Sequence, residues 1–370
     1  MSDFAIEVAG ADAPVRAAPD DTLLDACLRA GLAMSYNCRS GECGECVALL
    51  EAGDIEEMPG ADPAVFTDVD RRHGRVLTCM CFPRSDVRLS LALRDGVAAP
   101  RIQRVFAMVE AIDWHGPGIA EVAITTPGAL DYRAGQYFEW VLPGIAPDRS
   151  FSAANRPGSD VIRFHVRIYP DGAVGRYLRE EIVAGGIVEL VGPYGHFGFS
   201  ANAYRPAICV AGGTGMAPIR AVLDTAFARG DARPIRYFYG ARTRADLYCL
   251  DDMAAWQARQ PQFSFTPVLS DEPDGSDWTG RRGLVTKALA AEIGDAFGAE
   301  AYLCGPPAMI DAAISISTSS RQRVEAFGGV PGDAPVDLAS IRWAHEHAGR
   351  LAPGIVDEVQ VVVAPRQMRR

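Results

Sequence analysis

The spacing of apolar residues changes twice along the chain and divides it into three regions. In the first region, residues 1–97, the stretch 22–33 carries apolar residues at the spacing of one helix face, namely Leu24, Cys27, Leu28 and Leu32. Short runs typical of β-strands surround this stretch, at 4–8, 47–50 and 87–91. This pattern predicts a compact α+β domain.

The second and third regions differ in what separates their strands. From 101 to 200, β-like runs punctuated by Gly, Pro and Asp follow one another, at 105–109, 119–124, 137–142, 161–168 and 187–191. This spacing predicts a β-barrel. From 203 on, apolar strands alternate with helical stretches, at 207–211, 235–239, 263–269 and 301–304. This alternation predicts a parallel α/β sheet, and 95–100 is the expected linker after the first region.

The composition argues against several classes of function. The chain has 370 residues, of which 48% are hydrophobic and 22% charged, and a net charge of −11. No basic run is present, which argues against nucleic acid or an anionic membrane as a partner. No uninterrupted apolar stretch approaches the length of a membrane-spanning helix. Residues 1–97 hold 9 Arg against 17 Asp and Glu, so this region either docks on a basic patch of a partner or is a solvated face.

Four of the nine cysteines carry the strongest chemical signal. Three have the spacing C-x4-C-x2-C and a fourth follows well downstream: Cys38, Cys43, Cys46 and Cys79. This spacing is typical of plant-type [2Fe–2S] clusters, because the short gaps wrap one loop around the irons. Gly41 and Gly44 let that loop turn tightly and bring backbone N–H groups close to the sulfurs.

Other interpretations of these cysteines stay open. Structural zinc sites usually contain separated short C-x2-C pairs, whereas the first gap here is four residues. A disulfide framework is not expected, because the cysteine count is odd and the chain starts without the segments of a secretory signal. These features predict a reducing, cytoplasmic location. Cys81 competes with Cys79 for the fourth ligand position.

Three motifs fit nucleotide cofactors. The strand at 207–211 leads into the glycine-rich turn 212–218, whose N–H groups and helix start suit a phosphate, although a tight turn without a ligand has a similar sequence. In 149–152, Arg can clamp a pyrophosphate, Phe can stack on a flavin and Ser can bond its edge; the alternative is an ordinary barrel edge. The segment 304–307 ends a strand at the expected carboxyl edge of the sheet, where ligands bind, or is only a turn.

In this order, the motifs resemble those of the NADH-dependent iron–sulfur flavoprotein reductases of bacterial multicomponent oxygenases, which serve aromatic-ring dioxygenases and soluble methane or phenol monooxygenases. The similarity covers residues 3–327. It implies a multidomain α+β fold with a plant-type [2Fe–2S] ferredoxin domain at 1–97, an FAD-binding β-barrel at 101–200, and an NAD-binding α/β parallel-sheet domain of the ferredoxin–NADP reductase kind at 203–327. It favours Cys79 as the fourth cluster ligand, because the family's ligand follows the Leu-Thr pair directly.

The resemblance assigns roles residue by residue. The cluster ligands are Cys38, Cys43, Cys46 and Cys79. The FAD contacts are Arg149, Ser150, Phe151, Ser152, His165, Val166, Arg167, Gly172, Val174 and Gly175. The NADH contacts are Gly213, Thr214, Gly215, Met216, Ala217, Pro218, Gly240, Arg242, Asp246, Cys304, Gly305 and Pro306. The residues expected beside the reacting rings are Ser152, Cys304 and Phe327, the last as the aromatic residue of a final strand at 324–327 that covers the flavin.

Two departures from the family pattern matter. The flavin-phosphate turn usually carries Ser or Thr, but this chain has Gly175, so backbone N–H groups must contribute more of the FAD contact. The family usually ends near the covering aromatic residue, but here residues 328–370 follow, with a helix predicted at 336–351 and a strand at 359–363. This C-terminal extension is expected to cover the flavin, mediate dimerisation or form an unpacked tail.

The resemblance implies a function in electron transfer. A flavin accepts a hydride from NADH, and a one-electron [2Fe–2S] carrier passes electrons singly to an oxygenase or ferredoxin component. No acid–base pair or nucleophile is therefore predicted. NADPH stays open as the donor, because Arg242 and Arg244 are placed to meet a 2′-phosphate. The alternatives are the same core serving another acceptor such as a deoxysugar dehydratase, a redox sensor, or a zinc-stapled flavoprotein.

Overall fold

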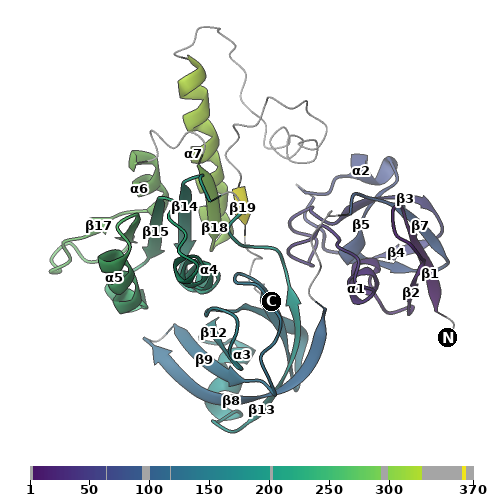
Figure 1. Cartoon of the computed structure of the whole chain (residues 1–370), viewed down its shortest axis with the longest axis horizontal. Helices are drawn as coiled ribbons and strands as arrows, with labels where there is room; N and C mark the ends of the chain where they lie inside the picture. The colour runs from purple at the N-terminus through teal and green to yellow at the C-terminus, as the bar shows by residue number, and fades with distance from the viewer. Residues whose placement is uncertain are drawn as a thin grey trace. The chain divides into compact units, whose positions relative to one another are not determined.

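The computed structural model describes residues 3–63, 65–93, 101–116, 118–200, 203–292, 299–326 and 361–363. The chain divides into two compact units. The first extends up to Phe199 and includes helix α4 (Met216–Ala228), and the second holds the segments Ser200–Gly215 and Arg229–Val363. Each of the three predicted regions forms a main sheet of its own (Figure 1), and the first region adds a second sheet of two strands.

The first region folds around a five-stranded sheet in the order β2-β1-β7-β3-β5. Its elements are β1 (Phe4–Val8), β2 (Val15–Ala17), α1 (Leu23–Arg29), β3 (Val47–Ala52), β4 (Ile55–Glu57), α2 (Asp68–Arg72), β5 (Arg75–Leu77), η1 (Thr78–Met80), β6 (Cys81–Pro83) and β7 (Val87–Ser90). Helix α1 begins after Thr22, whose hydroxyl oxygen accepts a hydrogen bond from the Asp25 N–H at 3.0 Å. Leu24 and Cys27 are fully buried, as the helix-face spacing predicts. The helix ends earlier than predicted, and Gly31 follows with φ +83°.

The second region is an antiparallel sheet of six strands in the order β11-β10-β13-β8-β9-β12. Its elements are β8 (Gln103–His115), β9 (Ile119–Thr125), β10 (Tyr137–Leu142), β11 (Ile145–Ser152), β12 (Val161–Arg167), α3 (Ala173–Glu180) and β13 (Ile187–Tyr194). Its core is aromatic: the Trp140 ring meets Phe151 and Phe164 edge-on, at centroid distances of 4.8 and 5.2 Å. Strand β11 is absent from the sequence prediction, because Pro147 and Asp148 interrupt its pattern.

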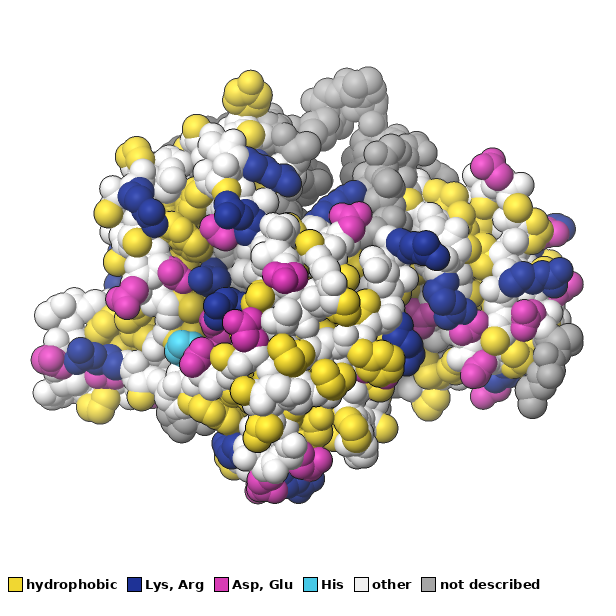
Figure 2. Space-filling model, turned by 60° about the horizontal axis from the view of Figure 1, so that its bottom comes forward, with side chains coloured by type: hydrophobic (Ala, Val, Ile, Leu, Met, Phe, Trp, Pro, Cys, Tyr) yellow, Lys and Arg dark blue, Asp and Glu magenta, His cyan; other side chains and the backbone are white. Residues whose placement is uncertain are grey.

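The barrel strands β8 and β13 carry apolar side chains on their outer face as well as on their inner face. Along β8, Ala107 and Val109 are buried, whereas Phe106 and Met108 are 65% and 42% exposed. Ile187 on β13 lies opposite Met108 and is also exposed. Figure 2 shows hydrophobic side chains gathered with charged ones on the face that carries these strands. Burial alternates with the two-residue period of a strand. The face that packs in the core is therefore identified by its burial, because apolar residues occur on both faces.

The third region is a parallel sheet in the order β17-β16-β15-β14-β18-β19. Its strands and short turns are β14 (Ala207–Gly212), η2 (Gly213–Gly215), β15 (Ile235–Ala241), η3 (Arg244–Asp246), β16 (Phe263–Leu269), β17 (Arg281–Arg282), β18 (Glu300–Cys304) and β19 (Val361–Val363). Its helices are α5 (Leu250–Arg259), α6 (Val285–Glu292) and α7 (Pro307–Ala326). The predicted parallel α/β sheet is confirmed, and its register places Gly212 beside Gly240 and Ala211 beside Cys304.

The prediction of a final strand at 324–327 is wrong for residues 324–326, which belong to helix α7. No Gly or Pro interrupts the sequence from 308 to 326, so nothing ends the helix before that point. The strand beside β18 is instead β19, three consecutive valines from the predicted stretch 359–363. Phe327, the linker residues 95–100 and the predicted helix at 336–351 lie outside the described residues.

Among the described residues, no helix combines the length and the hydrophobicity that crossing a membrane requires.

Candidate cofactor sites

The cluster loop, residues 34–46, directs backbone N–H groups at cysteine sulfurs. The N–H groups of Ser40 and Glu42 point at Sγ of Cys38, at 3.4 and 3.3 Å, and the N–H of Cys38 points at Sγ of Cys43 at 3.5 Å. A hydrogen bond from the Cys43 thiol, together with those from Ser40 and Glu42, lowers the pKa of the Cys38 thiol to about 5. The loop therefore stabilises negative charge on the Cys38 sulfur, as a thiolate ligand requires, whereas the hydrogen bond with Cys38 raises the pKa of the Cys43 thiol.

The four predicted ligand cysteines lie as two pairs of contacting thiols. Cys38 contacts Cys43, and Cys46 contacts Cys79. Among the described residues, no group of three or more metal-ligating side chains surrounds a single point. Two pairs suit two irons with two protein thiolates each, so these residues fit a [2Fe–2S] cluster. Cys81 is buried on β6, and its thiol interacts with Cys46 through charge, whereas Cys79 is the cysteine that hydrogen-bonds Cys46.

The glycines of this loop are required by space as well as by backbone angle. Gly41 and Gly44 have φ +75° and +74°. A Cβ atom at Gly41 would lie 3.0 Å from Cα of Ala61, and one at Gly44 would lie 2.9 Å from Cγ1 of Val65. A larger residue at either position would push the loop away from the sulfur atoms that it surrounds.

The predicted flavin motif 149–152 ends β11, at the edge of the barrel sheet. Ser150 and Ser152 lie opposite Glu139 and Tyr137 of β10, so these four residues share one face of the sheet. Phe151 faces the other way and is only 6% exposed, with its ring against Trp140. The structure therefore places the two serines where a ligand can reach them, and it places the Phe151 ring in the barrel core.

His165 on β12 is fully buried. Its Nε2 lies 3.1 Å from Oε2 of Glu121, and Arg163 meets the same carboxylate at 2.6 Å. The hydrogen bond with His165, followed by the contact with Arg163, lowers the pKa of Glu121 to about 2. Burial lowers the pKa of His165. Because the ring is enclosed by protein, an FAD contact at His165 would have to come from its backbone. Val166 is also fully buried and Arg167 is half-buried.

The predicted flavin-phosphate turn opens helix α3. Gly172 is the N-cap residue, and Val174 and Gly175 lie in the first turn, where backbone N–H groups have no partner within the helix. A Cβ at Gly175 would lie 3.1 Å from Cγ2 of Ile168. The turn therefore offers backbone N–H groups to an anion. The space that a Ser or Thr side chain would occupy at position 175 is partly filled by Ile168.

The nucleotide loop follows β14. Gly213 has φ +56°, and its carbonyl accepts hydrogen bonds from the hydroxyls of Tyr239 and Tyr248, at 3.0 and 3.4 Å. These two hydrogen bonds fix the position of the loop backbone at Gly213. A Cβ at Gly215 would lie 2.0 Å from the carbonyl oxygen of Cys304, so only glycine fits there. The loop then leads into helix α4, which begins at Met216. Met216 and Ala217 are buried, and Pro218 lies in the first turn.

The turn after β18 packs against the nucleotide loop. A Cβ at Gly305 would lie 3.0 Å from the N atom of Gly212, and a Cβ at Gly212 would lie 3.1 Å from Cδ of Pro306. Burial raises the pKa of the Cys304 thiol to about 12, so this thiol stays protonated at neutral pH and is no nucleophile. The structure thus brings the predicted segments 213–215 and 304–306 together at the carboxyl edge of the sheet, where phosphates and nicotinamides bind in such folds.

The predicted adenosine end lies at the carboxyl end of β15. A Cβ at Gly240 would lie 3.0 Å from Cβ of Val285. Asp246 accepts hydrogen bonds from the N–H and the hydroxyl of Thr243, both at 3.1 Å, and it lies 3.5 Å from Nη2 of Arg242. The Arg244 guanidinium forms an ion pair with Asp277. Arg242 and Arg244 therefore each already form an ion pair with a carboxylate.

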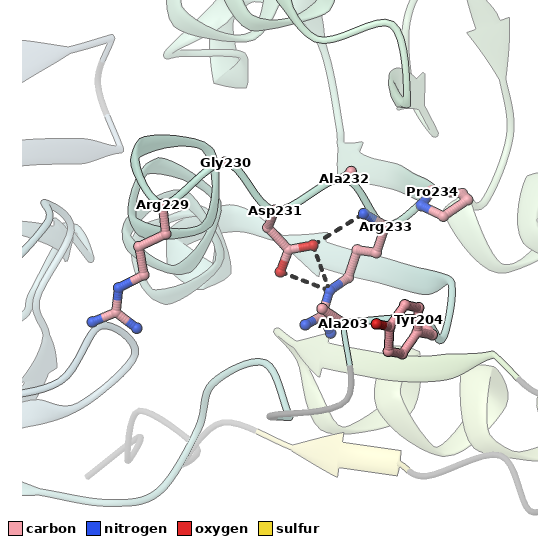
Figure 3. Close-up of a pocket in the computed structure, with 8 residues that line it drawn as sticks. All are labelled: Ala203, Tyr204, Arg229, Gly230, Asp231, Ala232, Arg233 and Pro234. Carbon is pink, nitrogen blue, oxygen red and sulfur yellow. Dashed lines mark hydrogen bonds and ion pairs between the residues drawn. The ribbon is translucent and has the colours of Figure 1, made fainter.

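A shallow hollow lies at the opposite edge of the same sheet (Figure 3). It is lined by Ala203, Tyr204, Arg229, Gly230, Asp231, Ala232, Arg233 and Pro234. Asp231 and Arg233 form an ion pair in it, at 2.9 Å. The lining segments precede β14 and β15, so they meet the amino ends of these strands and lie away from the nucleotide loop.

Some residues that shape these sites carry no local signal in the sequence. Tyr239 and Tyr248 hold the nucleotide loop, and Glu121 supports His165, yet each acts across a long sequence separation. Tyr239 occupies a strand position that is indistinguishable by pattern from core. Only pairing information between strands identifies such residues. Phe327, predicted to cover the flavin, lies outside the described residues.

Three family models match consecutive parts of the chain. They are the 2Fe-2S iron–sulfur cluster binding domain at residues 6–84, the oxidoreductase FAD-binding domain at 118–199, and the oxidoreductase NAD-binding domain at 209–314. Their order is that of the three sheets. The chain is thus an oxidoreductase with domains for a [2Fe–2S] cluster, FAD and NAD.

Similar proteins span nearly the same length. The reductase component DmpP of phenol 2-monooxygenase from Pseudomonas sp. (strain CF600) is 35% identical, over 81% of this chain and 86% of its own. The electron transfer component XylA of xylene/toluene monooxygenase from Pseudomonas putida is 34% identical, over 79% and 83%. The structure of the Amycolatopsis cytochrome P450 reductase GcoB covers 86% of this chain and 95% of its own, with 33% identity and a TM-score of 0.78. The ferredoxin reductase in carbazole 1,9a-dioxygenase covers 86% and 96%, with 27% identity and a TM-score of 0.72.

Replacing Cys79 by serine should remove the cluster, because Cys79 and not Cys81 hydrogen-bonds Cys46. We expect the purified Cys79→Ser variant to lose nearly all of the roughly two irons per chain and the broad iron–sulfur absorption, and to keep its FAD. The matched variant Cys81→Ser should retain both. Iron analysis and visible spectra of the two variants measure this difference. Loss of the cluster in Cys81→Ser but not in Cys79→Ser would make Cys81 the fourth ligand.

Replacing Gly215 by alanine should damage nucleotide binding, because the new Cβ would collide with a backbone oxygen. Overpacking of this kind costs roughly 1–3 kcal/mol, so we expect kcat/KM for NADH to fall by about tenfold or more. FAD and iron content should not change. Gly275→Ala is the control, because a Cβ there meets nothing within 4 Å. Equal kinetics in both variants would show that the loop does not bind the nucleotide.

Proposed function

Since the chain belongs to the family of iron–sulfur flavoprotein reductases that serve multicomponent oxygenases, we propose that it carries electrons from NADH through FAD and a [2Fe–2S] cluster to an oxygenase or ferredoxin component. The observation that carries this proposal is the cluster loop, in which three N–H groups meet the sulfurs of Cys38 and Cys43. The relatives named above supply the direction of electron flow, since two of them are electron-donating components of monooxygenases.

The cofactors supply the redox chemistry when bound: hydride acceptance at the flavin and one-electron transfer at the cluster. The protein's own contribution is position and environment. Ser152, which is half-buried at the end of β11, is the candidate hydrogen-bond partner for the flavin ring edge. Cys304 and the glycine loop would hold the nicotinamide end of NADH and its diphosphate. A Cys304 thiol that stays protonated fits a reaction that needs no nucleophile.

The acceptor is proposed from the relatives' names. Phenol, xylene and toluene are the substrates in those names, so the proposed partner hydroxylates a small aromatic or hydrocarbon substrate. The substrate itself would bind to that partner. A cytoplasmic location, the domain limits 1–97 and 101–200, and a third domain at 203–327 that also takes β19 from the segment 328–370 are further proposals. A flavin-covering role of Phe327 is proposed too, without the strand predicted to carry it, because 324–326 are helical.

NADH is the proposed donor, because the arginines at the adenosine end already have partners. Arg244 pairs with Asp277, and its backbone N–H is bound by Glu272 at 2.9 Å. Arg282 donates to the carbonyls of Glu272 and Pro273, at 2.8 and 3.1 Å. A 2′-phosphate would bring two negative charges among these carboxylates, whereas a ribose hydroxyl can donate to one of them.

An anaerobic titration tests the proposed function. The visible spectrum of the purified protein is recorded before and after addition of stoichiometric NADH. We expect flavin bands and the broader iron–sulfur absorption, both bleached by NADH. Flavin without the iron–sulfur contribution would contradict the ferredoxin part of the proposal. Both chromophores present but unchanged by NADH, and bleached by NADPH, would overturn the choice of donor.

Removing one carboxylate should relax the choice of donor. In Asp277→Asn, Arg244 loses its ion-pair partner and becomes available to a 2′-phosphate. Because both side chains are largely exposed, we expect a modest gain, about threefold in kcat/KM for NADPH, with little change for NADH. Asp274→Asn is the matched control, since Asp274 lies in the same loop and forms no ion pair among the described residues. Equal NADPH kinetics in the two variants would remove Arg244 from the specificity argument.

A further inference from the structure

The cluster loop contacts the barrel inside the first unit of the chain. The hydroxyl of Tyr137 on β10 donates to the carbonyl of Asn37 at 3.1 Å, and the N–H of Gly195 donates to the hydroxyl of Tyr36 at 3.1 Å. Asn37 directly precedes the ligand Cys38. A backbone carbonyl of the ferredoxin region and a backbone N–H of the barrel region are therefore each hydrogen-bonded to a tyrosine hydroxyl of the other region.

Arg39 is the charged centre of this contact. Its guanidinium lies 2.7 Å from Oδ1 of Asp25 and 2.6 Å from Oε1 of Glu139, and it stacks 3.8 Å from the ring centroid of Tyr194. Asp25 belongs to the ferredoxin helix α1, whereas Glu139 and Tyr194 belong to barrel strands. Only 12% of the Arg39 side chain is exposed. A guanidinium this buried needs its carboxylates, so separating the two domains would leave Arg39 without half of its charge partners.

The backbone of Arg39 is constrained as well. Its φ is +57°, a left-handed conformation that a non-glycine residue adopts only when its surroundings hold it there. Arg39 immediately follows Cys38, and the next residues supply the N–H groups that point at the Cys38 sulfur. The ion pair to the barrel is thus one residue away from the backbone that surrounds the cluster.

The barrel face used in this contact is the face of the flavin motif. Glu139 lies opposite Ser150, and Tyr137 lies opposite Ser152, in the β10–β11 register. Opposite residues of an antiparallel pair project to the same side. The residues that hold the cluster loop therefore stand beside the two serines assigned to the flavin.

We propose that Arg39, Glu139 and Tyr137 form a docking contact that positions the cluster loop for electron transfer from the flavin. The inference rests on the proposed function, because it assumes that electrons pass from flavin to cluster within this chain. In that step one electron leaves the reduced flavin and one ferric iron of the cluster becomes ferrous, with no bond formed by the protein. Glu139 and Tyr137 are positioning residues: they act through the loop and ligate no iron.

The test compares the holoprotein with Glu139→Gln, Tyr137→Phe and the double variant. Glu139→Gln removes the charge and keeps the shape, and Tyr137→Phe removes only the hydroxyl. The control is Glu189→Gln, which removes a carboxylate paired with Arg104 from the neighbouring strand of the same barrel. FAD and iron contents are measured first. If Glu139→Gln loses a cofactor, the proposal is tested with the rate of cluster reduction and the hydrogen exchange of Tyr137→Phe alone.

Two readouts are combined. Anaerobic stopped-flow mixing with NADH gives the rate of flavin reduction, and freeze-quench electron paramagnetic resonance gives the rate at which the reduced cluster appears. Breaking a buried charge pair together with a hydrogen bond shifts the docked population, so we expect cluster reduction to slow by about tenfold in the double variant. Flavin reduction should stay within about twofold of the wild-type rate, since the nucleotide loop is unchanged. Hydrogen exchange of the amides in 34–39 should become faster in the oxidised variants and stay unchanged in Glu189→Gln.

The outcomes separate the two claims. Cluster reduction at the wild-type rate in the double variant overturns the docking proposal. Slower cluster reduction with unchanged exchange in 34–39 also overturns it, because the residues would then act without holding the loop. A wild-type protein whose cluster never accepts electrons from the flavin contradicts the proposed function, while the exchange data still report whether the contact docks the loop.

Discussion

A single guanidinium, that of Arg39, links the two redox modules of the first unit. It is buried between a ferredoxin carboxylate and a barrel carboxylate, Asp25 and Glu139, and its charge cannot be left there with only one of them at low cost. Beside it, the Tyr137 hydroxyl and the Gly195 N–H bind the loop residues Asn37 and Tyr36, and the flavin serines lie on the same barrel face. Between a flavin and a cluster, which exchange only electrons, holding the distance constant is the main task of the protein.

Glycine performs the corresponding task at the nucleotide end. Gly215 lies so close to the carbonyl of Cys304 that no side chain fits, and Gly305 approaches Gly212 in the same way. These close approaches bring the ends of β14 and β18 together as one surface of backbone groups. Tyr239 and Tyr248 fix the carbonyl of Gly213 and so set the direction of the loop. Backbone geometry, more than charged side chains, therefore shapes this site.

The sequence predicts what depends on local spacing and misses what depends on long-range pairing. The cysteine spacing, the glycine loop and the three strand rhythms are local, and the fold class inferred from them is confirmed. The inward orientation of Phe151, the enclosure of His165 by Glu121 and the role of Glu139 require the register of the barrel strands. The final strand is misplaced because helix α7 meets no breaker before Ala326, while the edge beside β18 is taken by β19.

The order in which the two cofactors become reduced shows whether electrons pass from the flavin to the cluster. A single turnover of the wild-type protein with one equivalent of NADH, followed in time by flavin absorption and by electron paramagnetic resonance of the cluster, gives that order. We expect the flavin to be reduced first, at a rate that rises with NADH concentration. The cluster signal should then appear at a rate that does not depend on NADH. A cluster that is reduced before the flavin, or in protein from which FAD has been removed, would contradict electron transfer from the flavin to the cluster.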